Sequence, residues 1–382
     1  MKRIISIDGG GIRGIFALQI LGRIEALMRQ RRGRRDLVLA DEVDFFAGTS
    51  TGAVIATCLS WGMTVAQIER LYVESGSAMF ARSPWRLRWR AKYRADRLAA
   101  YFRELFAEPD GTPATLGTRR LRTLLLVVVR NATTGSPWPL TNHPEAKYNR
   151  SEAGAERNLD IPLWQLLRAS TAAPTYFTPE MIEIGGRTFL FVDGGITPYN
   201  NPALLSAMMA TLPCYAINWP TGPDRLHLTS VGTGGTRTLL RSPRSESVSI
   251  FRQIGFVPPA LIGSVSDQQD MLCRVLGRCL HGAELDREVG RLDGPSLLDA
   301  SEQKFAYLRY NRRLDVAGDA SLLPPLAKAK LDDLSLIPEL RELGRDYAER
   351  HVHPEHLFPA DADADDGVDT AAAAPRPSAD EA

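Results

Sequence analysis

Two units near the start of the chain share one order of parts and set the strongest limit on its fold. An apolar run at residues 4–7 precedes a glycine-rich loop at residues 8–14, and apolar residues then recur at helical spacing up to Met28. A second apolar run at 43–47 precedes a glycine-bounded turn at 48–52 and another apolar helical segment. Alternating strands and helices of this kind form a parallel sheet with helices on its faces. The sequence therefore predicts an α/β layered domain with a mainly parallel central sheet flanked by helices.

The rest of the chain divides into three expected parts. Residues 1–235 form the α/β core, residues 236–357 a mostly helical part packed on it, and residues 358–382, which are poor in apolar bulk, a disordered tail. The strands and helices expected after the first two units are strands at 121–129, 180–184, 187–192 and 226–231 and helices at 64–79, 95–107, from Pro202, at 256–282 and at 322–350.

Composition narrows the classes of partner and compartment. The chain has 46 basic and 45 acidic residues, a net charge of +1, so no overall field attracts nucleic acid and none is expected as a partner. The four cysteines show no metal-ligand spacing, and we expect reduced thiols in a cytoplasmic protein. No apolar stretch reaches the roughly 18 residues of a membrane-spanning helix, so any membrane contact is expected to be peripheral.

The first glycine loop fits the spacing G-x-G-x-x-G, which is typical of dinucleotide-binding turns. Such a site also needs an acidic residue about 20 positions later, at the end of a second strand. Asp36 lies at that distance but follows a basic run and precedes any strand. A dinucleotide site is therefore disfavoured, while the loop still presents backbone N–H groups to an anion at the start of a helix.

The second turn has the pattern G-x-S-x-G between a strand and a helix, the context of a nucleophile elbow. Ser50 stands at its centre, and small residues are needed at Gly48 and Gly52 because bulkier ones would clash with neighbouring backbone. The alternative is a serine- and glycine-rich turn that caps a helix. A serine hydroxyl becomes a nucleophile only with a base to take its proton, so a partner must lie elsewhere in the chain.

The blocks at residues 8–14, 48–52 and 193–195, in this order, resemble the three signature blocks of the patatin-like phospholipase family. Residues 172–177 and 201–202 are similar to that family's surroundings of the third block, so the resemblance covers residues 4 to about 235. It implies a patatin-like fold and a phospholipase A type of acyl hydrolase that needs no metal or other cofactor. It also implies a dyad in which Ser50 is the nucleophile and Asp193 its base.

Two alternatives to the dyad stay open from the residues themselves. Asp193 precedes a glycine, and Asp-Gly is a common turn pair. A triad would need a histidine after Asp193, and His227 or His281 has that order in the chain. His227, in an alternating strand pattern, is better explained as a structural histidine.

If the chemistry is acyl transfer, the glycine loop gains a role. The tetrahedral intermediate carries charge on oxygen, and preorganised backbone N–H groups stabilise it. The residues expected to form this oxyanion hole are Gly9, Gly10, Gly11 and Arg13. For the Arg13 side chain, contact with a substrate phosphate and pairing with an acidic side chain are equally favoured.

A more specific resemblance concerns residues 214–220 and 305–311, which are similar to the bacterial patatin-like effectors of cyclic-oligonucleotide antiphage signalling. It implies that a cyclic dinucleotide from a partner synthase switches on hydrolysis of membrane phospholipids at the inner face of the cell membrane. A ligand at a homodimer interface could supply the switch. The residues expected to contact this activator, on stacking and charge grounds, are Arg309, Tyr310 and Arg312.

Other readings of the sequence remain. The basic and aromatic segment at 82–94 suits the headgroup layer of an anionic bilayer, or is a solvated basic segment. An ungated lipase or esterase would keep the dyad without the activator. A nucleotide-binding phosphotransferase would use the glycine loop for phosphate and leave Ser50 and Asp193 without roles, and an inactive scaffold would not need the three blocks together.

Overall fold

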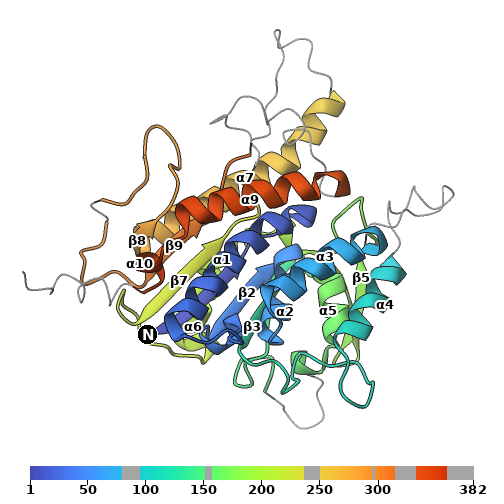
Figure 1. The fold of residues 1–382 in the computed structure, drawn as a ribbon. Coiled ribbons are helices and arrows are strands. Elements are labelled where there is room, and N and C mark those ends of the chain that lie inside the picture. The colour runs from blue at the N-terminus through green and yellow to red at the C-terminus, as the bar shows by residue number, and fades with distance from the viewer. Residues whose placement is uncertain (80–94, 151–156, 236–249, 295–296, 315–332, 359–382) are drawn as a thin grey trace, which may run out of the picture.

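One sheet runs through the described part of the chain, with helices on both of its faces (Figure 1). The structure is a computed structural model that describes residues 1–79, 95–150, 157–235, 250–294, 297–314 and 333–358. The basic and aromatic segment at 82–94 and the tail from residue 359 onward lie outside these ranges.

The nine strands found in the described ranges follow the order β5, β6, β3, β2, β1, β7, β9, β8, and β4 pairs with β3 off this path. Their bounds are β1 (Lys2–Ile7), β2 (Phe45–Thr49), β3 (Leu124–Asn131), β4 (Ser136–Thr141), β5 (Glu180–Ile184), β6 (Arg187–Asp193), β7 (Leu226–Val231), β8 (Arg278–His281) and β9 (Ala306–Tyr310). Strands β1, β2, β3, β7, β8 and β9 pair in parallel, while β4, β5 and β6 pair antiparallel. The predicted mainly parallel sheet is confirmed.

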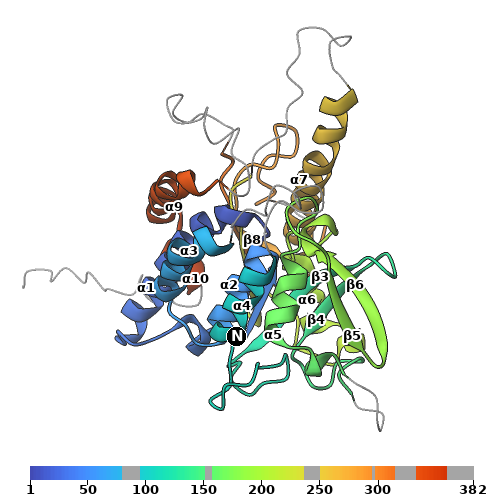
Figure 2. The same cartoon turned by 90° about the vertical axis from the view of Figure 1, so that its right-hand side faces the viewer.

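Helices cover the sheet in two groups. The longer helices are α1 (Gly14–Arg32), α2 (Thr51–Ser60), α3 (Val65–Met79), α4 (Ala95–Leu105), α5 (Leu163–Ser170), α6 (Ala203–Thr211), α7 (Ile250–Leu276) and α9 (Ile337–His351). Helices α1, α2, α5 and α9 bury their apolar side chains in one core, and α6 packs with α7 in a second core on the opposite face. Figure 2 shows α9 and α1 on one side of the strands and α7 and α6 on the other. None of the helices in the described ranges is both long and apolar enough to cross a bilayer.

The sheet continues past the expected boundary at residue 235. Strand β9 pairs in parallel with β7, and β8 pairs with β9. The helix expected at 256–282 ends at Leu276, and residues 278–281 form β8 instead. Helix α9 packs on α1. The segment after residue 235 therefore supplies two strands and the covering helices α7 and α9 to the same layered unit.

Strand β3 brings the second and third sequence blocks together. Strand β4 pairs with residues 126–131 of β3, so it occupies one edge of that strand over this length. Strands β2 and β6 must then share the other edge, where β2 pairs up to Val128 and β6 takes over at Val129. Asp193, the partner of Val129, thus arrives next to the point where the chain leaves β2 at Ser50.

Candidate active site

Ser50 lies at a sharp turn between β2 and α2. Its backbone angles are φ 54° and ψ −122°, a left-handed conformation that strains a residue with a side chain. A Cβ atom on Gly48 would lie 2.2 Å from the carbonyl oxygen of Gly52, and one on Gly52 would lie 2.2 Å from that of Ile7. The predicted strand-turn-helix geometry is confirmed, and both flanking glycines are required by backbone contact.

The hydroxyl of Ser50 and the carboxylate of Asp193 are in direct contact across 143 residues of sequence. Ser50 Oγ donates a hydrogen bond to Asp193 Oδ2 at 2.7 Å. The other carboxylate oxygen accepts from the N–H of Gly195 at 2.6 Å, so Asp193 caps the short 3-10 helix Gly194–Ile196. Both oxygens are therefore fixed, one toward the serine and one toward the backbone.

Burial makes Asp193 a stronger base than an ordinary aspartate. It is 5% exposed, and burial raises its pKa from 3.8 to about 6. Hydrogen bonds from Ser50 and Gly195, and the charge of the buried Arg168, lower the pKa but do not offset the burial. At neutral pH the carboxylate is mainly ionised, with its proton affinity moved toward that of a working general base.

Two further residues hold the serine turn in place, and neither was predicted as a functional residue from the sequence. Ser170, the last residue of α5, accepts a hydrogen bond from the Ser50 N–H at 2.9 Å and donates one to the carbonyl of Val128 at 2.8 Å. Thr49 Oγ1 donates to the carbonyl of Tyr199 at 2.6 Å. Ser170 lies two residues before the block at 172–177, and that proximity was the one available signal.

The glycine loop lies against Ser50. A Cβ atom on Gly9 would lie 2.4 Å from Asn200 Oδ1 and 3.4 Å from Ser50 Cβ. The Gly9 N–H donates to the carbonyl of Asn200 at 3.0 Å, and its carbonyl accepts from Thr233 Oγ1 at 3.0 Å. The loop is thereby held between the residues that follow Asp193 and those that follow β7.

The expected oxyanion donors differ in their availability. The N–H groups of Gly9 and Arg13 already donate to carbonyls, of Asn200 and Gly10 respectively. Those of Gly10 and Gly11 donate to no described residue. The Arg13 side chain turns back on the loop, where Nε donates to the Gly10 carbonyl at 3.4 Å, and no carboxylate of the described residues lies within ion-pair distance of it. Of the four expected donors, only the backbone N–H groups of Gly10 and Gly11 are therefore left without a partner among the described residues.

Neither histidine considered for a triad lies at the site. His227 is buried at the amino-terminal end of β7, where it pairs with Arg3 of β1 and bonds the carbonyl of His356 at 3.0 Å. Ser50 follows the carboxyl end of β2, the opposite edge of the parallel strands. His281 stacks on Tyr310, with ring centroids 5.0 Å apart. Burial lowers the pKa of both histidines, to about 4 and about 3.

The residues expected to contact an activator are placed differently from the expectation. Arg309 is 4% exposed in β9 and binds Asp8 with both Nη atoms, and Tyr310 is fully buried with its hydroxyl 3.1 Å from His356 Nδ1. Burial removes the exposed stacking and charged surface on which the expectation rested. Arg312 keeps 28% of its side chain exposed and lies 3.8 Å from Asp346.

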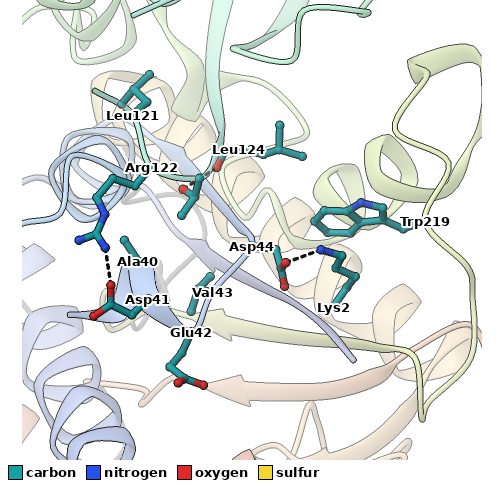
Figure 3. A pocket seen from close by; sticks show the side chains of 11 residues that line it. Lys2, Ala40, Asp41, Glu42, Val43, Asp44, Leu121, Arg122, Leu124 and Trp219 are labelled. Carbon is teal, nitrogen blue, oxygen red and sulfur yellow. Dashed lines mark hydrogen bonds and ion pairs between the residues drawn. The ribbon is translucent and has the colours of Figure 1, made fainter. Parts of the chain in front are cut away.

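A polar pocket of about 410 Å³ lies at the other end of the strands from Ser50 (Figure 3). Both cations that line it are paired: Lys2 with Asp44 at 2.5 Å, and Arg122 with Asp41. It therefore offers no unpaired cation to a phosphate. No group of three or more histidine, cysteine, aspartate or glutamate side chains in the described ranges is arranged to hold a metal ion.

Comparisons with known proteins agree with the arrangement of the three blocks. A family model described as patatin-like phospholipase matches residues 5–206. The chain is 28% identical over 211 residues to a cGAMP-activated phospholipase of Vibrio cholerae, a match that covers 53% of this chain and 56% of that protein. It is 28% identical over 253 residues to Patatin-17 of Solanum cardiophyllum, covering 62% of this chain and 61% of that protein. The chain thus spans less than two thirds of the length of these curated relatives.

Among solved structures, VipD from Legionella pneumophila aligns over 92% of this chain and 67% of its own, with 13% identity and a TM-score of 0.37.

Proposed function

The chain belongs to the patatin-like phospholipase family, and on that premise we propose that it is an acyl hydrolase that cleaves ester bonds of membrane phospholipids. Ser50 is the nucleophile and Asp193 its general base. The observation that carries the proposal is the 2.7 Å hydrogen bond from Ser50 Oγ to a buried carboxylate, at a strained elbow that lies against the loop of the first block. No third residue is needed to orient Asp193, since Gly195 already fixes its second oxygen.

The proposed reaction has two halves. Ser50 Oγ attacks the ester carbonyl carbon while its proton passes to Asp193 Oδ2, and the carbonyl oxygen becomes an oxyanion that accepts hydrogen bonds from the Gly10 and Gly11 N–H groups. Collapse breaks the ester C–O bond, and the alcohol leaves with the proton from Asp193. A water molecule then gives a proton to Asp193 and attacks the acyl-serine. The bond between the acyl carbon and Ser50 Oγ breaks, the proton on Asp193 passes to Ser50 Oγ, and the fatty acid is released.

We further propose that a cyclic dinucleotide controls this activity. The support is the similarity to relatives whose names describe them as cGAMP-activated phospholipases. An enzyme that attacks the membrane of its own cell must be nearly inactive until triggered, and a change from about 1% to 99% active needs roughly 5.5 kcal/mol of differential ligand affinity. In this proposal a partner synthase makes the cyclic dinucleotide, and the enzyme acts at the inner face of the cell membrane in antiphage defence. The activator binds at a homodimer interface, and the part-exposed Arg312 contributes to that site.

Fatty-acid release from liposomes of bacterial lipids tests both the proposed hydrolysis and its proposed control by a cyclic dinucleotide. Wild type, Ser50→Ala and Asp193→Asn are assayed with and without a panel of cyclic dinucleotides, and Asp224→Asn serves as a control because that side chain is 90% exposed. Release that needs one nucleotide and is lost in both dyad variants supports hydrolysis and control together. Release without any nucleotide, lost in both variants, supports the dyad and refutes the control. Release that survives Ser50→Ala, or no release under any condition, refutes the hydrolase.

A further inference from the structure

A buried ion pair connects the start of the glycine loop with the second-to-last residue of β9. Arg309 Nη1 donates to Asp8 Oδ1 at 2.9 Å and Nη2 donates to Asp8 Oδ2 at 2.6 Å. A third bond, from Nη1 to Ser230 Oγ, measures 2.7 Å. Both charged side chains are about 95% buried. The two residues are 301 positions apart, so the contact joins segments that are far apart in the sequence.

The sheet explains how the guanidinium reaches the loop. Arg309 on β9 pairs with Ser230 on β7, and Ser230 pairs with Ser6 on β1. Asp8 comes two residues after Ser6, so its side chain points to the same face of the sheet. The Arg309 side chain extends across β7, where it donates a hydrogen bond to Ser230, and its guanidinium binds both carboxylate oxygens of Asp8. Arginine fits this task because its planar fork matches a carboxylate in two bonds, whereas lysine offers a single point charge.

The pair belongs to a larger group of buried charges on the face covered by α7. Asp270 on α7 binds Arg274 through two hydrogen bonds of 2.9 and 2.8 Å and accepts a third from the Tyr307 hydroxyl at 3.0 Å. Two aspartates and two arginines thus balance in charge. Burial raises the pKa of the Asp8 carboxyl, and the guanidinium of Arg309 opposes that effect. Without Arg309 the carboxylate would face the negative charge of Asp270 with no cation bound to it.

The position of Asp8 decides where the oxyanion donors lie. Its N–H donates to the carbonyl of Val231 at 3.0 Å, and the next residue, Gly9, is bonded to Asn200 and Thr233. Gly10 and Gly11 follow directly. Oxyanion donors act only when they are held to within about 0.5 Å of the geometry in which they reach the developing charge. Any shift of Asp8 away from its ion pair is passed through one peptide unit to those donors.

We propose that Arg309 is a positioning residue that clamps the glycine loop through Asp8, so that the segment after residue 235 is required for turnover although it supplies neither member of the dyad. This inference rests on the proposed function of Ser50 and Asp193, because it concerns the oxyanion half of that chemistry.

Kinetics of Arg309→Lys and Arg309→Met test the clamp, with Arg278→Met on the neighbouring strand β8 as a control, since its side chain is 44% exposed and lies 3.6 Å from an exposed aspartate. The probes are a phospholipid substrate and a trifluoromethyl ketone analogue, whose serine adduct carries the oxyanion. In Arg309→Met we expect kcat to fall about a hundredfold, the cost of one oxyanion donor, and the ketone Ki to rise in parallel, while KM changes less than twofold. Arg309→Lys should lose less, and the control nothing. Unchanged kcat and Ki, or a loss of kcat with no change in Ki, overturns the inference.

Hydrogen exchange provides a readout that does not depend on activity. The amide hydrogens of Asp8 and Gly9 are both hydrogen-bonded in the wild type. In Arg309→Lys, which keeps the charge and folds more readily than the methionine variant, we expect them to exchange at least tenfold faster, while amides in β3 keep their rates. Equal exchange at Asp8 and Gly9 in both proteins refutes the clamp. If the wild type releases no fatty acid, the proposed function fails, and faster exchange would still support the clamp alone.

Discussion

Replacing Asp193 by asparagine should abolish hydrolysis and yet stabilise the fold. The amide is nearly the same shape as the carboxylate, so its oxygen can still accept from the Gly195 N–H and its nitrogen can donate to Ser50 Oγ. What the substitution removes is a buried negative charge. Burial of that charge raises the pKa of the carboxyl from 3.8 to about 6, which means that the folded protein disfavours the ionised form relative to the unfolded chain.

The size and pH range of the effect follow from those two values. A difference of about two units corresponds to about 3 kcal/mol at about 1.4 kcal/mol per unit. Wild type loses this free energy of unfolding as the pH rises from about 4, where the unfolded carboxyl ionises, to about 6, where the folded one ionises. Asp193→Asn does not lose this free energy, because the amide does not ionise. We therefore expect Asp193→Asn to be as stable as the wild type at pH 4 and to exceed it by the full difference in the free energy of unfolding at pH 7.

Thermal melting of both proteins between pH 4 and pH 8 measures the effect. A gain of about 3 kcal/mol corresponds to about 4 °C in Tm for a chain of 382 residues. Asp224→Asn, at an exposed position, should stay within about 0.5 kcal/mol of wild type throughout. A lower Tm for Asp193→Asn, or a gain of equal size at pH 4 and pH 7, would refute the argument that burial makes Asp193 basic.

Three further outcomes are expected. In a pH-rate profile, kcat/KM should fall tenfold per pH unit below about 6, since protonated Asp193 cannot accept the Ser50 proton; a flat profile down to pH 4.5 would exclude Asp193 as the base. Chemical denaturation should show Ser50→Gly more stable than Ser50→Ala by about 1 kcal/mol, because only glycine relaxes the strain at φ 54°; equal stabilities would show that no strain is stored there. Gly52→Ala should cost about 3 kcal/mol through its clash with the Ile7 carbonyl, whereas Gly263→Ala in α7, with no atom within 4 Å of the added Cβ, should stabilise by about 1 kcal/mol; similar Tm values for these two variants would contradict the packing at the elbow.

Local patterns allowed much of the sheet to be predicted. Strands β5 and β7 were expected at their observed bounds, and the elbow at Ser50 was expected from a strand, a short turn and a helix. These features depend on hydrophobic periodicity over a few residues. The contact between Ser50 and Asp193 was different, because it joins residues 143 positions apart and was expected only from the resemblance of three blocks.

Three strands were missed: β8, which replaces the end of an expected helix, and β4 and β9, whose omission has identifiable physical reasons. Strand β4 contains Pro137 and Pro139, which argue against a strand, but it pairs with β3 alone and so tolerates missing N–H donors. Strand β9 is short and contains Arg309, and a charged residue suggested an exposed surface. Its burial depends on Asp8, a partner that no local pattern indicates.

The most direct test of the central claim is to trap the acyl-enzyme. The protein, with the activator if one is required, is mixed with a radiolabelled phospholipid, quenched in acid within milliseconds to seconds, digested, and mapped by mass spectrometry. The account predicts a fatty-acyl adduct on the peptide that contains Ser50, with no adduct in Ser50→Ala. An adduct on another residue would contradict it. So would fatty-acid release by Ser50→Ala in an amount equal to that released by the wild type.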